Sequence, residues 1–177
     1  MGRAARQRDV ISRRGASLSD LEALYRSRFD VFARVAASVT GDPERARDVV
    51  QDSFATAVRK RASFRGAGPL EAWVWRIVLN NARSEARRRT PTAEPDPYAG
   101  TNGDHAIANG HSEHDLELRD ALAHLPERQQ TTVFLRYYAD LDYAAIGDAL
   151  GIAEGTVAAT LNAAHAALRT RLQEVRA

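Results

Sequence analysis

The stretch of this sequence best suited to bind another molecule is residues 73–89, where arginine and asparagine recur at helical spacing. One face of an α-helix is reached by steps of four, three and four residues, and these steps connect Arg76, Asn80, Arg83 and Arg87. Arginine offers a planar fork of donors to phosphates or base edges, and asparagine both donates and accepts. The pattern therefore favours binding of a polyanion whose bases are recognised by side chains. The alternative is an ordinary stripe of solvated surface residues.

The charge around this stretch favours the polyanion. Residues 59–89 hold nine lysines or arginines against two acids, Glu71 and Glu85, whereas the whole chain has a net charge of only +2. The segment 115–177 is net acidic, with nine acids against six arginines. Because the positive charge is concentrated in the middle of the chain, we expect an anionic partner to bind there.

The composition argues against catalysis. The chain has no cysteine, which excludes disulfides, thiolate zinc sites and cysteine nucleophiles. His111 and His114 have the spacing of a metal-ligand pair, but they lie in a polar segment that offers no second shell. The paired carboxylates Asp48 and Asp52 have no histidine near them in sequence with which a nucleophile–base pair could be assembled. We therefore predict no catalytic residue, no metal and no cofactor, and discount an enzyme.

Hydrophobic periodicity predicts an all-α protein whose first part contains three helices. Ser19 and Glu22 form a capping-box signature for a helix over about 20–39, and Asp42 with Pro43 begins a second. Two glycines and a proline in 64–69 predict a loop directly before helix 73–89. The buried face expected for that helix comprises Trp73, Val74, Ile77, Val78, Asn81 and Ala82, while Trp75 stays open between core and base stacking.

Two segments lack this periodicity. Residues 1–17 are basic and polar, and we expect a flexible arm without the apolar stretch of a signal peptide. Residues 90–113 contain three prolines, four acids and no lysine or arginine, which predicts a flexible acidic linker. No run approaches the ~20 apolar residues of a membrane-spanning helix, so we expect a cytoplasmic protein without membrane insertion.

The C-terminal part is predicted to be helical again. Helices are expected over 116–125 and 127–139, followed by a short helix around Ile146 that Asp142 caps. Gly151 makes a tight turn before a last helix, whose expected buried stripe is Val157, Leu161, Ala164, Leu168 and Leu172. A short helix, a glycine turn and a longer helix form a helix-turn-helix. The chain is thus predicted to have two small helical domains, 18–89 and 114–177, joined by the linker.

Several stretches, in order, resemble conserved regions of one family. The second region of the sigma-70 family of RNA polymerase sigma factors is similar to the stretches DVVQDSF at 48–54, FRG at 64–66 and WVWRIV at 73–78. The fourth region is similar to LPERQ at 125–129, LRY at 135–137, LDYAAI at 141–146 and LGIAEGTV at 150–157. Within the family, the chain resembles the small extracytoplasmic-function (ECF) group.

The resemblance implies partners and residue roles. Core RNA polymerase would be bound by an acidic edge of Asp48, Gln51 and Asp52. The minus-ten element of promoter DNA would be read and melted by Phe64, Arg65, Arg76, Asn80, Arg83 and Arg87. The acidic linker would thread polymerase channels that otherwise hold nucleic acid. An anti-sigma factor is a further candidate partner.

The sequence departs from the family at the recognition helix. Family members place several cations there, whereas the corresponding positions here are Thr156, Ala158, Ala159, Thr160, Asn162 and Ala163. Cations first return at Arg169 and Arg171. Because each phosphate contact adds to affinity for every DNA sequence, we expect weak minus-thirty-five binding. The alternative is a divergent sigma-like interaction protein that binds polymerase or a regulator without reading promoter DNA.

Overall fold

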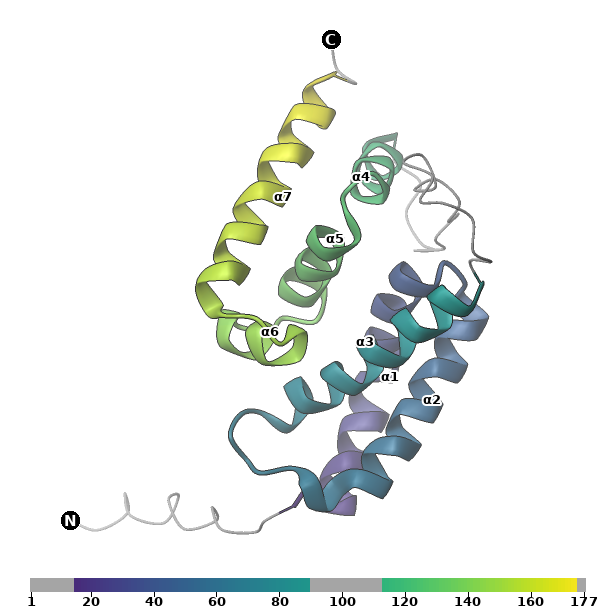
Figure 1. Cartoon of the computed structure of the whole chain (residues 1–177). Helices are drawn as coiled ribbons and strands as arrows, with labels where there is room; N and C mark the ends of the chain where they lie inside the picture. The colour runs from purple at the N-terminus through teal and green to yellow at the C-terminus, as the bar shows by residue number, and fades with distance from the viewer. Residues whose placement is uncertain (1–14, 90–112, 175–177) are drawn as a thin grey trace, which may run out of the picture.

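The computed structural model describes residues 15–89 and 113–174, and within those ranges every regular element is helical (Figure 1). This confirms the predicted all-α class. An N-terminal bundle contains α1 (Leu18–Thr40), α2 (Pro43–Lys60), a 3₁₀ turn η1 (Arg61–Ser63) and α3 (Leu70–Arg89). A C-terminal bundle contains α4 (Glu113–Ala123), α5 (Glu127–Val133), a π turn η2 (Phe134–Tyr138), α6 (Tyr143–Leu150) and α7 (Glu154–Glu174).

Side-chain caps set where the first two helices begin. The N-cap of α1 is Ser17, whose Oγ accepts a hydrogen bond from the Asp20 amide at 3.0 Å, so the capping box predicted at Ser19 was wrong by two residues. Ser17 has an extended backbone, whereas Ser19 already lies inside the helix. Asp42 caps α2 as predicted, by accepting from the backbone amides of residues 44 and 45.

Residues 15–17, which the sequence analysis assigned to the arm, are held by the loop that precedes α3. The Gly15 amide donates to the Phe64 carbonyl at 3.0 Å, and the Ala16 amide donates to the Arg61 carbonyl at 2.9 Å. Ala16 is buried. The rest of the predicted arm, 1–14, and the predicted linker up to 112 lie outside the described residues.

The core of the N-terminal bundle is built around Trp75. Its side chain is fully buried and lies on Phe32 of α1, with the ring centroids 4.0 Å apart, while Phe54 of α2 meets Phe32 edge-on. Trp73 is only half-buried and packs against Phe64. The expectation that Trp73 is the core residue was therefore wrong, because Phe32 of α1 packs on Trp75, whereas Trp73 packs on Phe64 of the loop.

The buried face of α3 is rotated accordingly. Its buried side chains are Ala72, Val74, Trp75, Val78, Leu79 and Ala82. Ile77 is half-buried, and so is Asn81, whose amide donates to Ser53 Oγ at 2.9 Å. This rotation decides which residues of α3 point outward.

The C-terminal bundle contains the predicted helix-turn-helix. Asp142 caps α6 by accepting from the Ala145 amide at 2.7 Å, and Gly151 makes the turn with a φ of 68°. The expected continuous helix over 127–139 is interrupted, because the Ala139 amide bonds to the Phe134 carbonyl five residues earlier and Asp140 takes a positive φ of 54°. This widened turn ends the helix and redirects the chain toward α6.

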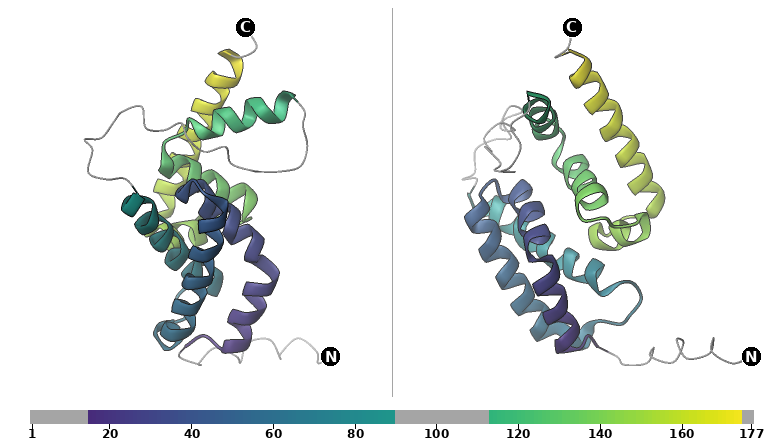
Figure 2. Two further views of the ribbon diagram at one scale, coloured as in Figure 1. Left: turned by 90° about the vertical axis from the view of Figure 1, so that its right-hand side faces the viewer. Right: turned by 180° about the vertical axis from the view of Figure 1, so that it is seen from behind.

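The two bundles pack side by side (Figures 1 and 2). Helix α6 lies against α3, and α5 with η2 lies against α1. Within the described ranges, no single helix is long and apolar enough to cross a membrane, although α6 and α7 pass that test together as a pair bent by 99°.

The two tryptophans of α3 provide a test of this packing. Trp75→Ala should lower the free energy of unfolding by about 3–5 kcal/mol, because it removes a fully buried indole from a close-packed site. Trp73→Ala, two residues away on the same helix, should cost distinctly less. Urea unfolding followed by circular dichroism measures both, and equal losses would contradict the rotation described here.

Candidate nucleic-acid interface and docking edge

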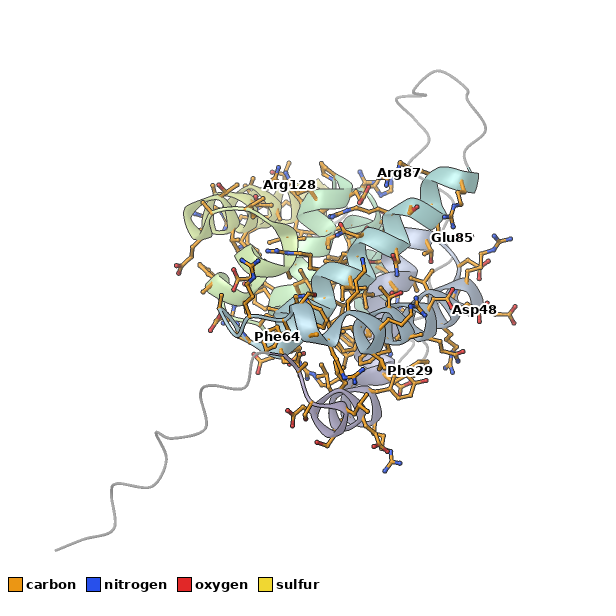
Figure 3. All side chains as sticks on the ribbon, turned by 60° about the horizontal axis from the view of Figure 1, so that its bottom comes forward. Phe29, Asp48, Phe64, Glu85, Arg87 and Arg128 are labelled. Carbon is orange, nitrogen blue, oxygen red and sulfur yellow. The ribbon has the colours of Figure 1, made fainter. Side chains whose placement is uncertain are left out.

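The predicted binding residues of α3 lie on the face of the helix that is turned away from the core of the N-terminal bundle. Arg76, Asn80 and Arg87 are exposed, and Arg83 is half-buried beside them. Figure 3 shows Arg87 near the C-terminal end of α3. Because Trp75 turns toward the core, the neighbouring Arg76 is turned outward, as the helical spacing requires.

Both acids of the basic segment are used within the N-terminal bundle. Glu71 Oε1 accepts from Trp75 Nε1 at 3.3 Å and from Arg28 of α1 at 2.9 and 3.0 Å. Glu85 pairs with Arg45 of α2 at 3.2 Å and with Arg88 at 3.4 Å. The acids therefore hold α3 against α1 and α2 and leave Arg76 and Arg87 without an acidic neighbour on α3.

A pocket of about 260 Å³ opens between the loop before α3 and the first turns of that helix. Its walls include the rings of Phe64 and Trp73, whose centroids are 5.6 Å apart, and the cationic side chains of Arg65 and Arg76. Gly66 turns the loop with a φ of 68°. Aromatic walls beside guanidinium groups are suited to an unstacked base and its phosphate.

The C-terminal bundle reaches the same face. Arg76 donates through Nε at 2.7 Å, and also through Nη2, to the Asp148 carbonyl of α6, and Asp148 lines the pocket. Arg83 Nε donates to Glu127 Oε1 of α5 at 3.1 Å. Sequence analysis missed Glu127 and Asp148, because no local pattern pairs residues 44 and 72 positions apart.

The acidic edge predicted on α2 lies on its exposed side. Asp48, Gln51 and Asp52 are all exposed, while the opposite side of the helix buries Val50 and Phe54. Helix α2 packs on α1 and α3, and Figure 3 shows Asp48 on the side of the N-terminal bundle away from the C-terminal bundle. The edge is thus open to a basic partner.

The recognition helix α7 presents small and polar side chains. The exposed members of the predicted set are Thr156, Ala159, Asn162 and Ala163. Ala158 and Thr160 are half-buried, and the Thr160 hydroxyl donates to the Thr156 carbonyl at 2.7 Å. Arg169 is exposed, while Arg171 is paired with Asp120 of α4 at 3.2 Å. A helix with this surface can enter a major groove, but it carries little positive charge to attract the phosphates.

In the part of the chain that the structure describes, no group of three or more histidine, aspartate or glutamate side chains is placed to hold a metal ion. Of the candidate ligand pair His111 and His114, His111 lies outside the described residues.

A cationic helix face beside an aromatic pocket, together with a helix-turn-helix, defines a protein of the nucleic-acid-binding class. The model of sigma-70 region 2 matches residues 24–92, and that of sigma-70 region 4 matches residues 115–168. The ECF RNA polymerase sigma factor SigL of Mycobacterium tuberculosis is 34% identical over 160 residues, which cover 88% of this chain and 90% of SigL. The chain belongs to the sigma-70 family, in its ECF group.

A second relative agrees with this assignment, and two solved structures share the fold. The RNA polymerase sigma-H factor of Pseudomonas aeruginosa is 32% identical over 147 residues, covering 75% of each chain. The fold is shared with CnrH, solved with the cytosolic domain of CnrY, at a TM-score of 0.65 and 21% identity, covering 90% of this chain and 91% of that one. It is also shared with the sigma factor RpoE of Bartonella quintana, solved with the anti-sigma factor NepR. The TM-score is 0.68 and the identity 24%, and the match covers 88% of this chain and 98% of that one.

Adding charge to α7 should strengthen its contact with duplex DNA. Ala159 and Ala163 are both exposed, one helical turn apart, so Ala159→Lys with Ala163→Arg should tighten binding to a duplex and steepen its salt dependence by up to about two phosphate equivalents. Fluorescence anisotropy of the full chain over a salt series measures this. The matched control, Ala23→Lys with Ala55→Arg, uses exposed alanines of α1 and α2, and an equal gain there would contradict a role for α7.

Proposed function

We propose that this ECF-type sigma factor docks on core RNA polymerase through Asp48, Gln51 and Asp52, and reads and melts the minus-ten promoter element with α3 and the loop before it. As a sigma factor, the protein directs promoter recognition and the initiation of transcription. The observation that carries the residue assignment is the cationic outer face of α3 beside the pocket of Phe64 and Trp73. The protein is a regulator of initiation, and we assign it no catalytic residue.

In this proposal the pocket captures one base of the unwound strand. Phe64 and Trp73 offer aromatic surfaces, while Arg65 and Arg76 offer donors to the phosphate or to the base edge. Asn80 and Arg87 continue the contact along α3. Because only a base that has left the stack can enter the pocket and lie on one of these rings, binding favours melted over paired DNA.

The C-terminal helix-turn-helix makes the weaker contact. Thr156, Ala159, Asn162 and Ala163 face outward and contact a minus-thirty-five element through shape and methyl groups, with little electrostatic attraction. We assign residues 18–89 to polymerase and minus-ten binding, 114–177 to the helix-turn-helix domain, and a cytoplasmic location. An anti-sigma factor is a candidate regulator, since both structural neighbours were solved with a second protein.

A second candidate function rests on the shortage of cations on α7. A sigma-like interaction protein would keep the acidic edge of α2 and bind polymerase or a regulator without reading promoters. The two functions differ in one assay, in which core enzyme and this protein are given a pre-melted template and a duplex promoter. Specific transcripts from the duplex support the sigma factor, and core binding without them supports the interaction protein.

Reversing the acidic edge should abolish polymerase binding. Asp48→Lys with Asp52→Lys changes two exposed side chains, so the fold should persist while a basic partner is repelled. Co-purification with core enzyme is the measurement. Glu22→Lys with Asp30→Lys makes the same charge change on exposed positions of α1 and should leave binding intact. Unchanged co-purification of the α2 variant would refute the docking edge.

Removing two reading residues should impair melting only. Arg76→Ala with Asn80→Ala keeps a helix-favouring residue at each exposed position, so the fold and core binding should be retained while open-complex formation falls at least tenfold. Permanganate reactivity of promoter thymines reports the melting. The control, Arg26→Ala with Ser27→Ala on exposed positions of α1, removes the same charge and should leave melting unchanged. If the α3 variant melted the promoter as well as wild-type protein does, the reading face would lie elsewhere.

A further inference from the structure

The chain just before α1 is hydrogen-bonded to the loop that forms the pocket. The Gly15 amide donates to the Phe64 carbonyl at 3.0 Å, and the Ala16 amide donates to the Arg61 carbonyl at 2.9 Å. Ala16 is buried, and the next residue caps α1, so three consecutive residues are held in place. We call these residues, 15–17, the strap. The strap fixes the point at which the N-terminal arm joins the rest of the protein.

Gly15 is the residue on which the geometry of the strap depends. Its φ of 110° lies in the left-handed region, which residues with a side chain rarely adopt. A Cβ added at Gly15 would lie 3.3 Å from the Arg61 carbonyl oxygen, the same oxygen that accepts from the Ala16 amide. A substitution of this glycine therefore disturbs the strap and leaves every charge of the chain in place.

The N-terminal arm, residues 1–14, is strongly basic. It contains a single acid, Asp9, and five arginines: Arg3, Arg6, Arg8, Arg13 and Arg14. Because consecutive Cα atoms are about 3.8 Å apart, the last two of these arginines must lie close to the strap. The match to sigma-70 region 2 begins at residue 24, so the arm and the strap both precede it.

The described surface beside the strap is cationic as well. Figure 1 shows that α2 ends, and the loop begins, next to the start of α1. This end of the bundle has four exposed cations, and among the described residues none of them pairs with an acid: Arg59, Lys60, Arg61 and Arg65. Two of them donate to neutral groups, the Thr56 hydroxyl and the Val58 carbonyl. The first turn of α1 contributes one acid, Asp20, so the positive charge prevails and attracts an anion.

We propose that the N-terminal arm is a second phosphate-binding element of the promoter-reading site, held at the loop by the strap. Its partner is the backbone of the unwound DNA strand whose base enters the pocket. The inference rests on the proposed function of α3 and its loop, and it adds a contact from outside the matched region. Because Arg65 lines the pocket and Arg14 adjoins the strap, both segments bind phosphates of the same strand.

Arginine is well suited to this partner. A guanidinium group forms two parallel hydrogen bonds with one phosphate, and each phosphate that it neutralises releases counterions. Neither gain depends on the base sequence. The arm therefore adds affinity, while the pocket selects the base.

Removing the two arginines next to the strap should weaken DNA binding and reduce its salt dependence. For a single strand, the slope of log affinity against log salt changes by roughly 0.7 for each phosphate contact. In the full-length chain, Arg13→Gln with Arg14→Gln should therefore reduce the slope by up to about 1.4 and weaken binding about threefold or more at low salt. Fluorescence anisotropy of a labelled random-sequence single strand, titrated over a salt series, measures both quantities.

The matched control removes the same charge away from the strap. Arg26→Gln with Arg128→Gln changes exposed arginines of α1 and α5 and should leave the slope unchanged. A wild-type slope in the arm variant, or no binding by wild-type protein at low salt, would overturn the proposal. Binding of wild-type protein to phosphatidylserine vesicles, together with an unchanged slope in the arm variant, would overturn it in favour of a lipid surface.

The strap is tested with all charges retained. Gly15→Ala places a methyl group at a positive φ beside the Arg61 carbonyl oxygen, so it should weaken single-strand binding about as much as the loss of Arg13 and Arg14 does. In the background of Arg13→Gln with Arg14→Gln, the same substitution should add little, because the two effects share one contact. Gly41→Ala is the control, since Gly41 has a φ of 71° at the other end of α1, and it should not change binding. A loss from Gly15→Ala that is equal in both backgrounds, or absent from both, would refute delivery of the arm by the strap.

These outcomes are distinguishable from a failure of the proposed function. Promoter-specific transcription by wild-type protein with core enzyme tests the sigma activity, whereas the salt slope of single-strand binding tests the arm. If wild-type protein transcribes and the arm variant keeps the wild-type slope, the arm contact is refuted and the sigma activity stands. If the arm variant loses slope but wild-type protein directs no promoter-specific transcription, the arm contact stands and the proposed function fails.

Discussion

The burial of Trp75 against Phe32 is the constraint on which the rest of the N-terminal bundle depends. The indole is fully buried against Phe32 of α1, and its burial sets the rotation of α3 about its own axis. With that rotation, Arg76 and Asn80 face outward, and Trp73 is left to line the loop pocket. Packing in the core thus decides the composition of the functional surface.

Electrostatics within the bundle follow the same division. Glu71 and Glu85, the two acids of the basic segment, form contacts that hold α3 against its neighbours. The partners of Arg83 and Arg76 come instead from a different part of the chain: the Glu127 carboxylate pairs with Arg83, and the Asp148 carbonyl accepts from Arg76. The Arg76 and Arg83 contacts are polar and partly exposed, so each contributes little to the packing of the two bundles.

The helix-turn-helix is complete in geometry and poor in charge. Asp142 and Gly151 shape its turn, and Val157 and Leu161 anchor α7 in the bundle. Its outward positions carry methyl, hydroxyl and amide groups, which offer little charge to a phosphate backbone. Exposed cations are therefore distributed unequally between α3 and α7.

The sequence alone determined what local chemistry controls: the helical class, the Asp42 and Asp142 caps, the Gly151 turn and the cationic spacing of α3. Each depends on residues within a few positions of one another, where backbone and side-chain rules apply directly. It failed where distant neighbours decide. Ser17 caps α1 instead of Ser19 in a segment that the loop before α3 holds in place, and Trp75 is buried instead of Trp73 because α1 supplies Phe32. The meeting of Arg76 with Asp148, 72 residues away, was decided only by tertiary packing, because no local pattern encodes a contact between two bundles.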